Sequence, residues 1–178
     1  DDPLYRKHAA LTGKLLAENG MTLVYGGGNK GLMGAVANGA LKHGGKVTGV
    51  IPEILKDREH HHAGITQLHI VSDMHTRKKM MYELCDAAII LPGGNGTLDE
   101  MFEALTLIQT HKIERVPVIL VGKSYWKGLL AWVRETMLHK EHNISEEDLD
   151  LFYMTDDPDE VVKHIAAFYA TSHLRPNF

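Results

Sequence analysis

Cysteine is almost absent from this chain: Cys85 is the one thiol among 178 residues, so an internal disulfide cannot form. Cys85 lies just before an apolar run at 87–91, and we expect it to pack in the core of a protein in the reducing cytoplasm. Apolar runs of roughly 18 residues, which a membrane-spanning helix needs, are also missing, and no signal peptide is visible. We therefore expect a cytoplasmic protein with no membrane partner.

Basic residues form no dominant block either. The formal net charge is −4, which argues against nucleic acid as the main partner, because nucleic-acid sites need concentrated positive charge. Hydrophobic residues make up 44% of the chain and charged residues 24%, the composition of an ordinary soluble globular protein. The length predicts one domain, residues 1–178, with a sizeable core.

Short apolar runs alternate along the chain with segments of helical spacing. The predicted strands cover 21–25, 46–51, 68–71, 87–91, 117–121 and 151–154. The predicted helices cover 4–19, 32–42, 74–84, 97–111 and 158–170, and one more begins with Ser124 as its cap. This alternation predicts an α/β fold, doubly wound and Rossmann-like, with a mostly parallel sheet and helices on both faces.

The most informative stretch, 91–100, reads LPGGNGTLDE and lies between a predicted strand and a predicted helix. Glycines let the backbone approach an anion closely, and the first N–H groups of a helix point at it with the positive end of the dipole behind them. Thr97 adds a hydroxyl, and Glu100 adds a carboxylate one turn into the helix. The stretch predicts a phosphate site beside a carboxylate, and hence chemistry on a phosphorylated small molecule.

The same residues have a purely structural interpretation. Thr97 and Glu100 have the spacing of a capping box, in which threonine caps the helix and glutamate reaches back to the N–H of the cap. A capping box does not explain three glycines in four positions after a strand, because a plain strand-to-helix turn needs only one or two. Both interpretations remain open at the level of sequence.

A second glycine turn, 26–31, follows the predicted strand 21–25 and begins with Gly26, Gly27 and Gly28. Ligands of doubly wound folds bind beyond the C-terminal ends of the strands, so both glycine turns are expected to face one pocket. The glycines superficially resemble a dinucleotide fingerprint, but their spacing is wrong. The next strand also ends in Pro52 and Glu53 rather than in a clear ribose-binding carboxylate, so support for an NAD site is weak.

Two clusters of titratable residues lie between the glycine turns. One cluster consists of three consecutive histidines, His60, His61 and His62, which could suggest a zinc site. Consecutive side chains point in different directions, so we expect these histidines to be exposed to solvent and to bind no metal. Arg77 and Lys78 lie early in a helix that Ser72-Asp73 can cap, where positive charge opposes the macrodipole. A bound anion nearby would offset that cost.

Three motifs, in order along the chain, resemble those of the LOG ("lonely guy") family. They are YGGGNKGLMG at 25–34, MHTRK at 74–78 and PGGNGTLDE at 92–100, the last matching the family signature PGGxGTxxE. The family contains the cytokinin riboside 5′-monophosphate phosphoribohydrolases and was long labelled "possible lysine decarboxylase". The similarity covers nearly the whole chain, although the strand with which family members usually begin is absent from it.

The resemblance implies hydrolysis of the N-glycosidic bond of a nucleoside 5′-monophosphate, without a cofactor, to free base and ribose 5-phosphate. It places the catalytic pair on Arg77 and Glu100, and a carboxylate near C1′ can stabilise an oxocarbenium-like transition state. The general acid for the leaving base is unassigned. The phosphate- and nucleotide-binding positions implied by the resemblance are Gly26, Gly27, Gly28, Met74, Lys78, Gly93, Gly94, Asn95, Gly96 and Thr97.

Several points of specificity and assembly stay open. Leu107 replaces the tryptophan that plant-like members carry, and the surrounding sequence is more similar to the longer bacterial branch, so AMP itself is an alternative substrate. The helix 97–111 is apolar on more than one face, which indicates either a deep core helix or an interface, and the resemblance favours a homodimer or a higher dimer-based assembly.

Three other functions are also considered. A nucleotide-binding regulatory protein would keep the glycine turns without needing Glu100. An NAD-dependent oxidoreductase would need the dinucleotide site for which support is weak. A lysine decarboxylase would need a lysine bound to pyridoxal phosphate, and no sequence context marks one.

Overall fold

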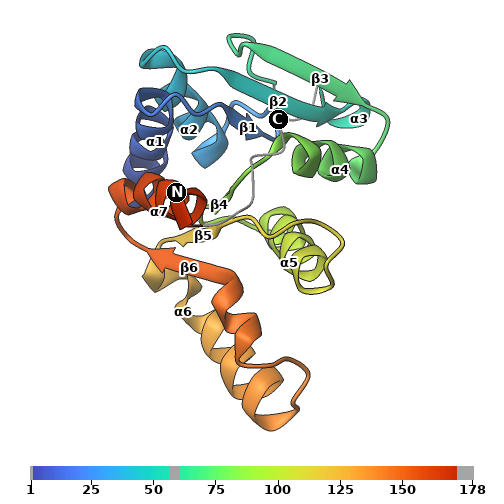
Figure 1. The fold of residues 1–178 in the computed structure, drawn as a ribbon. Helices are drawn as coiled ribbons and strands as arrows, with labels where there is room; N and C mark the ends of the chain where they lie inside the picture. The colour runs from blue at the N-terminus through green and yellow to red at the C-terminus, as the bar shows by residue number, and fades with distance from the viewer. Residues whose placement is uncertain (1, 57–60, 172–178) are drawn as a thin grey trace.

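The computed structural model describes residues 2–56 and 61–171, and these form strands and helices in alternation (Figure 1). The first half supplies one three-stranded sheet. Its elements are α1 (Pro3–Glu18), β1 (Leu23–Tyr25), α2 (Gly31–Lys42), β2 (Val47–Pro52), α3 (Glu53–Lys56), β3 (Gln67–Val71) and α4 (Met74–Leu84). The strands are all parallel in the order β1-β2-β3, with Leu23 opposite Val47 and Gly49 opposite Leu68.

The second half repeats the pattern in a second parallel sheet, β4-β5-β6. Its elements are β4 (Ala88–Ile90), α5 (Asn95–Gln109), β5 (Val118–Val121), α6 (Lys123–Trp132), a π-helical segment (Val133–Lys140), a 3₁₀ turn (Glu147–Leu151), β6 (Phe152–Thr155) and α7 (Pro158–Thr171). The predicted α/β fold with parallel strands is therefore confirmed, and the predicted boundaries hold to within a few residues.

The two sheets are joined by side chains rather than by a strand pair. Within the described ranges, β1 pairs only with β2 and β4 only with β5, and Val24 and Ile89 line one groove between the sheets. Helix α1 packs against both α2 and α7, so it holds the two halves together on one face (Figure 1). Every residue of β2 and β5 is buried, in agreement with the wholly apolar sequence of β5 and with a β2 sequence whose one polar residue is Thr48.

One predicted cap is wrong. Helix α6 begins at Lys123, with Gly122 at the N-cap position in a left-handed conformation of φ +102°, and the Lys123 N–H donates to the Asp156 carboxylate at 2.7 Å, so Ser124 is not the cap. The Ser124 hydroxyl lies within the first turn instead, 3.1 Å from the Tyr5 hydroxyl. In the sequence, a serine inside the first turn resembles a serine cap, and only the backbone conformation of Gly122 distinguishes these two positions.

Among the described helices, none is long and apolar enough to cross a membrane.

Helices α1 and α2 approach each other closely because small residues line their contact. A Cβ atom added at Gly39 of α2 would lie 2.1 Å from the carbonyl oxygen of Ala10 in α1. We expect Gly39→Ala to lower the free energy of unfolding by about 1–3 kcal/mol, because backbone rather than a flexible side chain would have to move. Chemical denaturation measures this change.

Gly128 of α6 is the matched control, since a Cβ there would meet no atom within 4 Å. Gly128→Ala should leave stability unchanged or raise it by about 0.5–1 kcal/mol through helix propensity. Equal stability of the two variants would show that the α1–α2 contact can relax to accept a methyl group.

Candidate active site

The glycine turn at 91–94 connects the end of β4 to the start of α5. The N-cap of α5 is Gly94, with φ −90° and ψ −157°, and no side chain caps the helix. The alternative interpretation of Thr97 as a helix cap is therefore wrong: the helix begins at Asn95, two residues earlier than predicted, so Thr97 lies inside its first turn. The first intrahelical bond runs from the Leu98 N–H to the Gly94 carbonyl, which leaves the preceding N–H groups for solvent or a ligand.

Gly93 is required by the side chain of Thr97. A Cβ atom at Gly93 would lie 2.1 Å from the Thr97 hydroxyl oxygen and 2.8 Å from its Cβ. Gly94 and Gly96 have open space where a Cβ would be, so no contact within the protein requires them to be glycine. Open space over the first turn of an uncapped helix is the arrangement that admits an anion.

The other glycine turn makes room for Arg77. A Cβ atom at Gly26 would lie 1.9 Å from Nη2 of Arg77, and the same Nη2 donates to the Gly26 carbonyl at 3.4 Å. Arg77 is 6% exposed. The two glycine turns thus lie at the ends of β1 and β4, as predicted, and the first of them contacts the helix α4 that carries the basic pair.

Asp73 caps α4, as predicted. Its carboxylate accepts from the Thr76 N–H at 2.9 Å, and hydrogen bonds from the Ser72 hydroxyl and from Thr76 hold the pKa of Asp73 well below its usual range. The cap fixes where α4 begins, so Met74, Arg77 and Lys78 take defined positions on its first turns. Met74 lies beside the guanidinium, with its sulfur 3.7 Å from Nη1 of Arg77.

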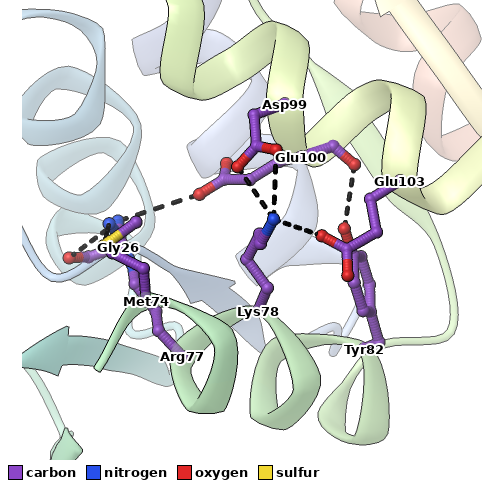
Figure 2. Close-up of polar contacts among 8 residues, drawn as sticks. All are labelled: Gly26, Met74, Arg77, Lys78, Tyr82, Asp99, Glu100 and Glu103. Atoms are coloured by element: carbon purple, nitrogen blue, oxygen red, sulfur yellow. Dashed lines mark hydrogen bonds and ion pairs between the residues drawn. The ribbon is translucent and has the colours of Figure 1, made fainter. Parts of the chain in front are cut away.

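Arg77 and Glu100 face each other across the space between α4 and α5 (Figure 2). Nη2 of Arg77 lies 3.9 Å from a carboxylate oxygen of Glu100, and the Glu100 side chain is 30% exposed. Nε of Arg77 is buried without a hydrogen-bond partner among the described residues. A long ion pair of this kind orients both groups and leaves donor capacity on the guanidinium for an anion.

Lys78 occupies a different environment from its neighbour. Its ammonium lies 2.9 Å from Asp99 and 2.5 Å from Glu103, both on α5, and the Lys78 side chain is 10% exposed (Figure 2). Hydrogen bonds to Glu103 and then Asp99 raise the pKa of Lys78. The ammonium therefore bridges the two helices. Asp99 and Glu103 were not recognised as site residues from the sequence, although their i, i+4 spacing places them on one helix face.

Tyr82 supplies a further link between the same helices. Its hydroxyl donates to the backbone carbonyl of Glu100 at 2.9 Å, and burial raises the pKa of the phenol (Figure 2). Together with the Lys78 ion pairs, this contact holds α5 against α4 on both sides of Glu100.

A groove of about 1040 Å³ runs between α4 and α5 over β4. Glu100, Glu103 and Leu107 line it from α5, and Cys85 lies in its wall. Burial raises the pKa of the Cys85 thiol to about 12, so the thiol is protonated at neutral pH and is a poor nucleophile. The expected packing role of Cys85 agrees with this environment.

The histidine run is only partly described. His60 lies outside the described residues, and the backbone of His61 pairs with that of Gly28. The His62 ring lies 3.3 Å from the Asn38 side chain and His62 is 9% exposed, so the expected exposure to solvent is wrong at this residue. Within residues 2–56 and 61–171, no three His, Cys, Asp or Glu side chains are grouped closely enough to hold a metal ion.

Comparison with known proteins identifies the family. The sequence model described as "possible lysine decarboxylase" matches residues 33–165. A cytokinin riboside 5′-monophosphate phosphoribohydrolase of Rhodococcoides fascians is 45% identical over 132 residues, which cover 72% of this chain and 66% of that protein. The chain belongs to the LOG family. The resemblance carried by the three motifs is thereby confirmed.

A second relative agrees with this placement, and one solved structure shares the fold. A cytokinin riboside 5′-monophosphate phosphoribohydrolase of Arabidopsis thaliana is 44% identical over 133 residues, 74% of this chain and 60% of that protein. The matched segment thus spans a little under two thirds of both relatives. The molybdenum cofactor binding protein of Rippkaea orientalis superposes with a TM-score of 0.71 at 22% identity, covering 95% of this chain and 90% of that one, and so shows the shared fold.

Proposed function

We propose that this LOG-family protein hydrolyses the N-glycosidic bond of nucleoside 5′-monophosphates, releasing free base and ribose 5-phosphate. The observation that carries the proposal is the placement of Arg77 and Glu100 3.9 Å apart, beside the uncapped start of α5. The relatives named as cytokinin riboside 5′-monophosphate phosphoribohydrolases support a cytokinin nucleotide as substrate. AMP is the alternative substrate.

The start of α5 is the proposed phosphate site. Backbone N–H groups of the segment 94–97 and the Thr97 hydroxyl would donate to the phosphate oxygens, and the positive end of the helix dipole favours the dianion. The open space at Gly94 and Gly96 supports this assignment, because it leaves room for a phosphate where side chains would otherwise lie. Asn95 begins the helix and belongs to the same proposed site.

Glu100 is the proposed catalytic carboxylate. Breaking the C1′–N bond leaves its electron pair on the base and positive charge on the ribose, which a nearby carboxylate stabilises. Glu100 would also take a proton from the attacking water, whose oxygen forms the new bond to C1′. Arg77 would hold this carboxylate in place and contact the nucleotide through its remaining donors.

The rest of the proposed site surrounds this pair. Gly26 allows Arg77 to lie against the backbone, Gly27 and Gly28 continue the same turn, and Met74 flanks the guanidinium. Lys78 would contribute mainly by holding α4 at a constant distance from α5, since two carboxylates already neutralise its charge. In this arrangement the nucleotide would bind across the ends of β1 and β4.

The phosphate requirement is directly testable. We expect release of base from AMP and from isopentenyladenosine monophosphate, with adenosine and isopentenyladenosine at least about 100-fold slower in kcat/KM, because phosphate binding energy is used at C1′. Chromatography of the released base measures all four reactions, and the ratio between the two nucleotides gives the base preference. Equal rates with and without the phosphate would contradict the assignment of the start of α5.

Glu100→Gln separates a catalytic from a structural role. Glutamine keeps the size and hydrogen-bonding capacity of the side chain but removes its charge, so we expect kcat to fall on the order of 100-fold or more with little change in Tm. Glu18→Gln, which removes an exposed carboxylate paired with Lys14 on α1, is the control and should keep full activity. If Glu100→Gln retained wild-type turnover, Glu100 would have only a structural role. That result would contradict the proposed catalytic role of this carboxylate.

We also propose that two copies of the chain associate through the groove between α4 and α5. The apolar residues of α5 do not all lie in the core: Met101 and Ile108 are buried there, whereas Leu107 is half-buried and lines the groove. A groove of about 1040 Å³ with an apolar wall beside the proposed active site supports an interface that helps to form the substrate pocket.

Light scattering at micromolar concentration should give a mass of at least twice 19.8 kDa. Leu107→Glu should yield a folded monomer with reduced turnover, because the charge would be placed in the proposed interface. Met101→Glu is the contrasting variant and should unfold the chain, because Met101 is 1% exposed. A fully active species of 19.8 kDa would rule out the assembly.

A further inference from the structure

The hydroxyl of Tyr125 donates a hydrogen bond to the backbone carbonyl of Gly93, at 2.6 Å. The two residues belong to different elements: Gly93 lies in the glycine turn before α5, and Tyr125 lies in the first turn of α6. This contact therefore ties the proposed phosphate loop to a part of the fold that none of the three family motifs includes.

Peptide geometry determines what the contact does. The peptide bonds of the described residues are trans, so the Gly93 carbonyl and the Gly94 N–H, which belong to one planar unit, point in opposite directions. A carbonyl held toward Tyr125 keeps the Gly94 N–H directed to the other side of the loop. A peptide between two glycines rotates more easily than any other, so an external partner has the greatest effect at this position.

Tyr125 is 44% exposed, and its ring packs against two other aromatic rings. It packs edge-on against Trp126, with ring centroids 4.8 Å apart, and edge-on against Tyr5 at 5.9 Å. Trp126 is 1% exposed, and its indole N–H donates to the carbonyl of Val121 at the end of β5. The position of the Tyr125 hydroxyl is therefore set by a buried aromatic residue and a central strand.

The glycine loop also contacts this region directly. A Cβ atom at Gly122, the N-cap of α6, would lie 3.3 Å from the ring of Pro92 and 3.5 Å from Tyr5. The loops after β4 and β5 are therefore packed together. Motion of the glycine turn relative to the start of α6 is restricted, and the Tyr125 hydrogen bond adds a directional restraint on a single peptide.

We propose that Tyr125 is a positioning residue for phosphate recognition: by fixing the Gly93 carbonyl, it pre-orients the Gly94 N–H at the start of α5 for the 5′-phosphate. This inference rests on the proposed function. Tyr125 acts through the loop and not on the bond that breaks, so it contributes to binding of the phosphate group and not to the chemical step.

Tyr125→Phe removes the hydroxyl and keeps the ring. We expect its dissociation constant for ribose 5-phosphate, measured by calorimetry, to rise about 3- to 10-fold, the value of one neutral hydrogen bond. KM for AMP should rise by a similar factor while kcat changes less than about twofold. Tm should stay close to that of the wild type, since the contacts with Trp126 and Tyr5 remain.

Tyr5→Phe is the matched control. It removes the hydroxyl that lies 3.1 Å from Ser124 in the same aromatic cluster, but that hydroxyl makes no contact with Gly93, so affinity for ribose 5-phosphate should be unchanged. Wild-type affinity in Tyr125→Phe, or equal weakening in both variants, would overturn the proposal. So would a fall in kcat with an unchanged KM.

Calorimetry also distinguishes this inference from the proposed hydrolysis. A wild-type protein that binds ribose 5-phosphate but releases no base from any nucleotide would refute the activity and leave the role of Tyr125 supported if Tyr125→Phe binds more weakly. A wild-type protein that releases base from AMP but binds neither ribose 5-phosphate nor inorganic phosphate would refute the role of Tyr125 and leave the activity supported.

Discussion

The separation between α4 and α5 is the constraint on which the candidate active site depends. The Lys78 ammonium is almost fully buried and lies between Asp99 and Glu103, so the two helices cannot move apart without leaving a charge unpaired. Removing the carboxylates would leave the Lys78 charge unpaired in a largely buried position, which is costly, whereas the Asp99 and Glu103 side chains are 55% and 36% exposed and can be solvated without their partner. The 3.9 Å distance between Arg77 and Glu100 follows from this bridge, since each residue is adjacent in sequence to one of its members.

Small residues provide the second constraint, because they permit approaches that any side chain would prevent. Gly26 admits the Arg77 guanidinium against the backbone, and Gly93 admits the Thr97 hydroxyl over the loop. Both approaches occur at the C-terminal ends of parallel strands, where a doubly wound fold leaves its loops open to a ligand. The glycines in the two motifs therefore have different roles. Gly26 and Gly93 make room for atoms of Arg77 and Thr97, whereas Gly94 and Gly96 leave open space.

Local signals in the sequence predicted most of the fold and the motif residues of the candidate site, but not their partners Asp99, Glu103 and Tyr125. Apolar runs and helix caps such as Asp73 depend on neighbouring residues, so the strands, the helices and the parallel arrangement followed from pattern alone. The errors occurred where two local patterns compete. Thr97 and Glu100 have the spacing of a capping box, and Ser124 precedes a helical run, yet Gly94 and Gly122 occupy the N-cap positions of the two helices.

The distance along the chain between interacting residues separates what the sequence determined by itself from what only the tertiary structure decided. The glycine turns, the basic pair on α4 and the carboxylate on α5 belong to contiguous motifs, and the sequence was sufficient to identify them together with their family. The ion pairs of Lys78 and the hydrogen bond from Tyr125 to Gly93 join residues 21 to 32 positions apart. Only packing brings such residues together, because side-chain partners at that separation leave no periodic trace in one sequence.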